Sequence, residues 1–247
     1  MNIIKHIPNT ITSMNLLCGV MGVIFTLQGE LSIAFYLMLA AAVCDFLDGL
    51  AARALDAYSA IGKELDSLAD LISFGLLPAL ILHRRMIEGG ITGFWSYIPI
   101  LICVFSALRL AKFNVDERQS ENFLGLATPA CALWCGSLVY AADHGVMSIA
   151  HLLHTPWFIP TASVILAVLL ISEIPMFSFK FKKDSPYNLV RKYFIIIVAG
   201  IAIVTWVLSI NWSYIVLLTF TAYITLNLIM ALFGLSASKK IDSCISK

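Results

Sequence analysis

The stretch that decides the class of this protein is VCDFLDGLAARALDAYSAIGKELDSLADLI, residues 43–72. Four of its aspartates recur at helical spacing among apolar residues: Asp45, Asp48, Asp66 and Asp70. One isolated carboxylate inside a membrane helix costs at least about 2.5 kcal/mol, so four of them require compensation. A divalent cation supplies that compensation because it turns mutually repelling oxygens into ligands. The stretch therefore predicts a metal site, flanked by small residues and an arginine that suit a phosphate.

The composition is that of a membrane protein. The 247 residues are 60% hydrophobic and only 13% charged, and the mean hydropathy is +0.90. A soluble domain carries about 25% charged residues. Apolar runs of roughly 20 residues, long enough to cross a bilayer, recur along the chain. The net charge of +1 gives no indication of a nucleic acid or another polyanion as partner.

The apolar runs predict an all-α bundle of about eight transmembrane spans. They cover approximately residues 9–28, 31–53, 66–87, 94–112, 126–143, 156–176, 193–209 and 212–234. Turn residues separate the later runs, and no repeat of 20–50 residues is present. Because the intervals are short, residues 1–247 are expected to form a single integral-membrane domain.

Basic residues are distributed unevenly over the two sides that eight spans define. One side carries fourteen of them: Lys5, Arg53, Lys63, Arg109, Lys112, Arg118, Lys180, Lys182, Lys183, Arg191, Lys192, Lys239, Lys240 and Lys247. The other side carries only Arg84 and Arg85. Because loops rich in Lys and Arg stay in the cytoplasm, we expect both termini to be cytoplasmic. The aspartates would then lie near the cytoplasmic leaflet of the inner or plasma membrane.

The spacing of the aspartates places them on two helix faces. On a helix that advances about 100° per residue, one face carries four residues of the motif: Asp45, Asp48, Gly49 and Ala52. Arg53 adjoins this face. A second face, on the next span, carries Gly62, Asp66 and Asp70. The two faces would meet across a short hairpin, where small residues admit a close helix or a flat ligand. The alternative is helix packing with aspartates as hydrogen-bond partners, but four carboxylates exceed what packing requires.

The same residues resemble a known family. The pattern D-x-x-D-G-x-x-A-R-x8-G-x-x-x-D-x-x-x-D, present here in full, is the motif of the CDP-alcohol phosphotransferases. The resemblance implies a membrane enzyme that transfers a phosphoalcohol or phosphatidyl group from a CDP-linked donor to an alcohol and releases CMP. It also implies a homodimer, with a catalytic core over about residues 8–130 and additional helices over 156–234.

The resemblance implies roles for individual residues as well. Two divalent ions, Mg2+ or Mn2+, would be bound by Asp45, Asp48, Asp66 and Asp70. Asp70 would also be the general base for the acceptor hydroxyl. The CDP moiety would be surrounded by Gly49, Ala52, Arg53 and Gly62. Further donor contacts are expected from Asn9, Thr12 and Ser59, since the two hydroxyls can reach a pyrophosphate.

Two segments bear on the acceptor. Asn15 stands where many relatives that use glycerol phosphate have an arginine, which favours an acceptor without a phosphate. Residues 109–115 (RLAKFNV) and 123–130 (FLGLATPA) resemble the phosphatidylserine synthase branch. That branch has arginine at the position of Lys112 and proline at that of Ala127, and a lysine lacks the bidentate geometry of an arginine.

The expected reaction is therefore transfer of the phosphatidyl group of CDP-diacylglycerol to the hydroxyl of L-serine. The residues expected to hold serine, or a phosphate, are Asn15, Arg109, Lys112 and Asn114. Basic residues that reach the lipid head groups are the alternative for this second cluster. Two other functions remain open. One is a sister enzyme with glycerol 3-phosphate or inositol phosphate as acceptor, and the other is a cation transporter, which the absence of paired half-repeats disfavours.

Overall fold

The computed structural model describes residues 6–115, 123–144, 147–177, 188–207 and 211–232. The helical segments, in chain order, are α1 (Ile7–Gln28), α2 (Leu31–Ala54), α3 (Ala60–Asp70), η2 (Leu71–Leu76), α4 (Leu77–Glu88), η3 (Phe94–Tyr97), α5 (Ile100–Val115), α6 (Thr128–Asp143), α7 (Met147–His154), α8 (Phe158–Ile171), α9 (Asn188–Val207) and α10 (Ser213–Leu232). The strands β1 (Phe123–Leu124) and β2 (Pro175–Met176) form a short antiparallel ladder. The predicted all-α bundle is thus confirmed in class, with this small ladder added to it.

Five helical segments of the described residues are long and apolar enough to cross a membrane. They are Ile7–Gln28, Leu31–Ala54, Ala60–Glu88, Phe94–Val115 and Ser213–Leu232. The helix α8 and the apolar part of α9 are shorter, and α6 has 16 residues. Both chain ends lie outside the described residues, as do several predicted cytoplasmic basic residues: Lys5, Arg118, Lys180, Lys182, Lys183, Lys239, Lys240 and Lys247.

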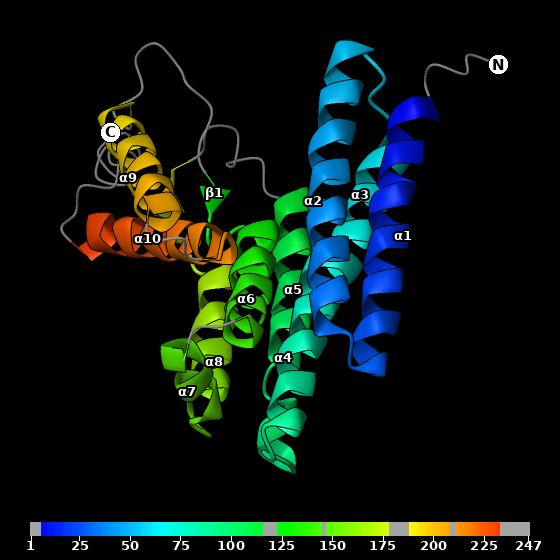
Figure 1. The fold of residues 1–247 in the computed structure, drawn as a ribbon. Helices are drawn as coiled ribbons and strands as arrows, with labels where there is room; N and C mark the ends of the chain where they lie inside the picture. Colours follow the sequence, from blue (N-terminus) through cyan, green and yellow to red (C-terminus); the bar gives the residue numbers. More distant parts are fainter. Residues whose placement is uncertain (1–5, 116–122, 145–146, 178–187, 208–210, 233–247) are drawn as a thin grey trace, which may run out of the picture.

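The first four of these long segments run alongside one another, and the fifth, α10, lies across their direction (Figure 1). The turn between α1 and α2 is made by Gly29, whose φ of +90° ends α1 in the left-handed region. A Cβ atom at Gly29 would lie 3.0 Å from the Arg84 guanidinium. The α1–α2 turn and the end of α4 therefore share one end of the bundle, and the α2–α3 turn lies at the opposite end (Figure 1).

The third long helix begins six residues before the predicted span 66–87. Ser59 caps α3, because its Oγ accepts a hydrogen bond of 3.0 Å from the Gly62 amide. The helix then widens into one π-helical turn, η2, immediately after Asp70. Pro78 follows this turn and has no N–H for an α-helical bond to the carbonyl of Phe74. The wider turn changes the register between the carboxylate-bearing half of the helix and its apolar half.

Close helix contacts bring the aspartates together. A Cβ atom at Gly19 of α1 would lie 2.2 Å from Ser73 Oγ in η2, so only glycine allows this approach. Ser73 Oγ also donates to the carbonyl of Asn15 at 3.1 Å. On the other side of the bundle, Phe35 of α2 packs where Gly136 of α6 has no side chain. These contacts hold α1 against the third helix and α2 against α6.

Candidate active site

Three of the four predicted aspartates converge where α2 faces α3. Asp45, Asp48 and Asp66 each offer a carboxylate oxygen, and these oxygens lie within 4.8 Å of one another. Asp66 Oδ1 is buried and has no hydrogen-bond partner among the described residues. Three carboxylates at this spacing, one of them with a buried oxygen that lacks a partner, fit a hard divalent cation, which prefers oxygen ligands. The side chains present are therefore compatible with the metal that the motif implies.

The fourth aspartate is also buried and interacts with this acidic triad. Asp70 is 8% exposed, and it interacts electrostatically with Asp45 and Asp66. The Asn15 amide of α1 donates to Asp70 Oδ1 at 3.3 Å. Asn15 itself is fully buried, and its Oδ1 has no partner in the described part of the chain. Asp70 thus adjoins both the triad and an unpaired amide oxygen.

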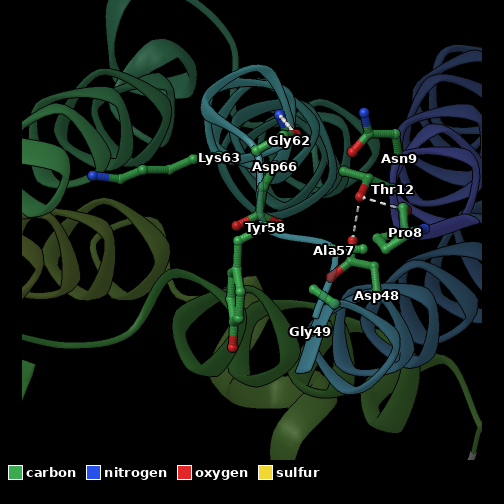
Figure 2. A pocket seen from close by; sticks show the side chains of 12 residues that line it. Pro8, Asn9, Thr12, Asp48, Gly49, Ala57, Tyr58, Gly62, Lys63 and Asp66 are labelled. Carbon is green, nitrogen blue, oxygen red and sulfur yellow. Dashed lines mark hydrogen bonds between the residues drawn. The ribbon is translucent and has the colours of Figure 1, made fainter. Parts of the chain in front are cut away.

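A pocket of about 220 Å³ opens beside the triad. Residues of α1, α2, α3 and the α2–α3 turn line it: Pro8, Asn9, Thr12, Asp48, Gly49, Ala52, Ala57, Tyr58, Ser59, Gly62, Lys63 and Asp66. In Figure 2, Asn9 lies on the side of Gly62 that faces α1, and a dashed line joins the neighbouring Thr12 to Asp48. The pocket combines carboxylates, hydroxyls and an amide with small residues, which suits a charged, phosphate-bearing ligand.

The glycines determine the shape of this pocket. A Cβ atom at Gly62 would lie 2.8 Å from Asn9 Oδ1 and 2.9 Å from Ser59 Oγ. A Cβ atom at Gly49 would meet only the Arg53 guanidinium, at 3.9 Å. Gly62 therefore lets α3 approach Asn9, whereas Gly49 leaves space free inside the pocket.

Most of the residues predicted to bind the CDP-linked donor line the pocket, and one of them lies at its edge. The lining includes Asn9, Thr12, Gly49, Ala52, Ser59 and Gly62. Arg53 is exposed and is not among the lining residues; its Nε donates to the Gly49 carbonyl at 2.9 Å. The sequence reasoning missed Tyr58 and Lys63, which also line the pocket. Lys63 Nζ donates to the Asn114 carbonyl at 2.9 Å, and its side chain points away from Asn9 and Thr12 in Figure 2.

The predicted acceptor residues on α5 have different surroundings. Arg109 is 8% exposed, its Nε has no hydrogen-bond partner among the described residues, and it interacts electrostatically with Asp70. The burial of Arg109 disfavours the alternative interpretation that this side chain extends to the lipid head groups. Lys112 is exposed and forms a 3.1 Å salt bridge with Glu173. Asn114 Nδ2 donates to Ser67 Oγ at 2.9 Å, which ties α5 to α3.

Comparison with known proteins agrees with the motif. A sequence model described as CDP-alcohol phosphatidyltransferase matches residues 5–172, which include every residue of the acidic triad and the pocket. The chain belongs to the CDP-alcohol phosphatidyltransferase family. The matched segment extends from α1 to the end of α8, so α9 and α10 lie outside the part that the family model covers.

Named members of the family show how far the similarity extends. The chain is 33% identical over 208 residues to a CDP-diacylglycerol–serine O-phosphatidyltransferase of Mycobacterium leprae, covering 81% of this chain and 66% of that protein. The corresponding protein of Mycobacterium tuberculosis is 34% identical over 70% of this chain and 61% of its own length. An archaetidylserine synthase of Methanothermobacter thermautotrophicus is 31% identical over 68% of each chain. The chain thus spans slightly less than two thirds of the mycobacterial proteins.

Proposed function

We propose that this protein transfers the phosphatidyl group of CDP-diacylglycerol to the hydroxyl of L-serine, forming phosphatidylserine and CMP. One observation carries the proposal. Asp70 interacts electrostatically with Asp45 and Asp66 of the acidic triad and also with the buried Arg109, so a single carboxylate would serve both a donor site and an acceptor site. The printed names of the mycobacterial relatives support serine as the acceptor.

The donor is assigned to the pocket beside the triad. Thr12 and Ser59 offer hydroxyls, and Asn9 offers an amide, to the cytidine diphosphate. Gly49 and Ala52 leave room for it, and Arg53 at the pocket edge can turn its fork toward a phosphate oxygen. The acyl chains remain among the surrounding lipids, since apolar side chains cover the outer faces of α1 and α2.

The residues that would hold the metal are Asp45, Asp48 and Asp66, with Asp70 at their edge. Two Mg2+ or Mn2+ ions bound there would neutralise the pyrophosphate and the departing CMP. The chain itself fixes the carboxylates: Thr12 Oγ1 donates to Asp48 Oδ2 at 2.6 Å, and Asn15 donates to Asp70. This preorganisation keeps the oxygen ligands in place before the donor arrives.

The acceptor step follows from the position of Asp70. The serine hydroxyl oxygen forms a bond to the phosphorus that carries diacylglycerol, and the bond from that phosphorus to the CMP oxygen breaks. Asp70 accepts the hydroxyl proton, because an alcohol is a weak nucleophile at neutral pH. The Arg109 guanidinium pairs with the serine carboxylate, and the unpaired Asn15 Oδ1 accepts from the serine ammonium.

We further propose eight spans with cytoplasmic termini, a homodimer, and one domain over residues 1–247. The distribution of basic residues supports this orientation. Lys63, close to the pocket, lies at the α2–α3 end of the bundle, and Arg84 lies at the opposite end, beside Gly29. Labelling of single cysteines introduced at Tyr58 and Gly90 with an impermeant reagent tests the orientation. Only the second should react from outside the cell.

The function is tested with labelled CDP-diacylglycerol and a panel of acceptors: serine, glycerol 3-phosphate, inositol and inositol 1-phosphate. Purified protein with Mn2+ or Mg2+ should form a lipid product and CMP with serine alone. Formation of a different product would move the protein to a sister activity within the family. Absence of CMP release with every acceptor would contradict the transferase assignment itself.

A further inference from the structure

Two side chains of α10 hold the backbone of Phe177, the residue that follows β2. Asn227 is fully buried, and its Oδ1 accepts a 3.0 Å hydrogen bond from the Phe177 amide. The Tyr223 hydroxyl donates to the Phe177 carbonyl at 3.3 Å. Asn227 Nδ2 donates to the Tyr223 carbonyl at 2.8 Å, and the rings of Phe177 and Tyr223 lie 5.1 Å apart. We refer to Tyr223, Asn227 and Phe177 as the α10 clamp.

The clamp is connected to the wall beside Arg109. The strand β2, which directly precedes Phe177, pairs with β1. The connection continues through two backbone bonds, from Gly125 N to Ile174 O at 3.0 Å and from Leu126 N to Leu169 O at 2.9 Å. A small cavity in this region is lined by Arg109, Lys112, Leu124, Leu170, Ile171 and Ser172. The segments that the clamp holds therefore form part of the surroundings of the guanidinium.

The clamp also lies within electrostatic range of Arg109. Tyr223 is 5% exposed and interacts electrostatically with Arg109. Asp70 of the third helix and Tyr223 of α10 therefore both interact with this guanidinium. Holding the long, flexible Arg109 side chain in one orientation costs rotamer entropy. Interactions of the guanidinium with both Asp70 and Tyr223 offset that cost and keep it oriented toward Asp70.

We propose that Tyr223 and Asn227 are positioning residues that set the affinity for an acceptor bearing a carboxylate. They act through Arg109: the clamp fixes the ladder that borders the cavity beside the arginine, and Tyr223 interacts electrostatically with the guanidinium. The inference rests on the proposed function and deepens it. It assigns acceptor selection to α10, a helix outside the segment that the family model matches.

The test compares Tyr223→Phe and Asn227→Leu with wild-type protein in detergent or liposomes. Tyr223→Phe keeps the ring but removes the hydroxyl, and Asn227→Leu keeps the approximate volume but removes the bond to Phe177. A lost hydrogen bond of about 1 kcal/mol corresponds to about a 5-fold change in affinity. We expect the apparent KM for serine to rise about 5-fold in each variant, with the KM for CDP-diacylglycerol unchanged. Thr225→Val is the control, since among the described residues the Thr225 hydroxyl bonds only carbonyls of its own helix.

A double-mutant cycle separates positioning from general stability. If Tyr223 acts through Arg109, Tyr223→Phe in an Arg109→Lys background should change the serine KM less than about 2-fold, because the shared interaction is already impaired. Unchanged serine kinetics in Tyr223→Phe would overturn the inference. It would also be overturned if the variants lost activity equally toward serine and CDP-diacylglycerol and this loss was accompanied by a lower Tm. Wild-type protein that makes no phosphatidylserine would overturn the proposed function, and the inference with it.

Discussion

The Thr12 hydroxyl lies 2.6 Å from Asp48 Oδ2 and joins α1 to α2 inside the candidate site. Both side chains are buried, at 3% and 7% exposure. Thr12 Oγ1 is also 3.0 Å from the Pro8 carbonyl, so its proton has two acceptors in reach. When Asp48 is ionised, the shorter and charge-assisted bond is favoured. A residue of the first helix therefore orients a carboxylate of the acidic triad that the second helix carries.

Replacing Thr12 by valine removes this donor while conserving the shape of the side chain. A hydrogen bond to a charged group contributes about 1.5–3 kcal/mol, so we expect kcat/KM to fall about 10- to 100-fold. Steady-state kinetics with CDP-diacylglycerol measure this loss. Thr10→Val is the matched control, because the Thr10 hydroxyl is exposed and its one bond within the described part of the chain goes to the His6 carbonyl. Equal activity of the two variants would show that Thr12 does not orient Asp48.

Neutralising one carboxylate of the triad should abolish turnover. Asp45→Asn, Asp48→Asn and Asp66→Asn each remove a charged ligand but little volume, so the proteins should still fold and insert. The control is Asp56→Asn in the exposed α2–α3 turn, where φ is +46° and asparagine is tolerated. Lipid-product formation and size-exclusion chromatography are the measurements. A triad variant with wild-type turnover would exclude that carboxylate from the metal site.

Removal of the metal should also destabilise the protein. Without cations, the clustered carboxylates repel one another, and a ligand at 100 times its Kd stabilises a fold by about 2.7 kcal/mol. EDTA should therefore lower the Tm of the wild-type protein, and Mn2+ or Mg2+ should restore it. Asp66→Asn should show a smaller response to EDTA. Full activity of the EDTA-stripped protein would contradict a metal-dependent transfer.

Arg109→Ala should weaken acceptor binding by about 2–4 kcal/mol, since a charge partner is lost in a desolvated site. Arg109→Lys should restore only part of it, because the planar fork is missing. The loss should be seen in the KM for serine. Arg84→Ala is the control; its salt bridge to Glu88 on an exposed helix surface contributes about 0.5 kcal/mol or less. A change confined to the KM for CDP-diacylglycerol would assign Arg109 to the donor instead.

Gly62→Ala should reduce donor affinity, because the added methyl group would push Asn9 and Ser59 away from their positions in the pocket. We expect about a 10-fold higher KM for CDP-diacylglycerol, equivalent to about 1.4 kcal/mol. Gly200→Ala in α9 is the control: its Cβ atom would meet nothing within 4 Å, and alanine favours a helix over glycine. An unchanged donor KM in Gly62→Ala would show that the substrate does not need this close approach.

The sequence alone predicts the helical membrane class and the two carboxylate-bearing faces. Both follow from local properties, namely apolar length and the period of an α-helix. Asp45 and Asp48 share a face whatever the helix packs against, and Asp66 lies one turn before Asp70 on the next helix. The convergence of three of these carboxylates follows as soon as the two faces meet.

The environment of each remaining site residue was decided by the tertiary structure. Arg109 and Lys112 are three residues apart in a basic cluster, yet only Arg109 is buried beside Asp70. The start of the third helix at Ala60 depends on the Ser59 cap. The electrostatic interaction between Arg109 and Tyr223 joins residues more than a hundred positions apart. The period of the helix specifies which residues share a face. The burial of each side chain and its interaction partners depend on how helices that are distant in the sequence pack together, and this packing is a property of the folded chain.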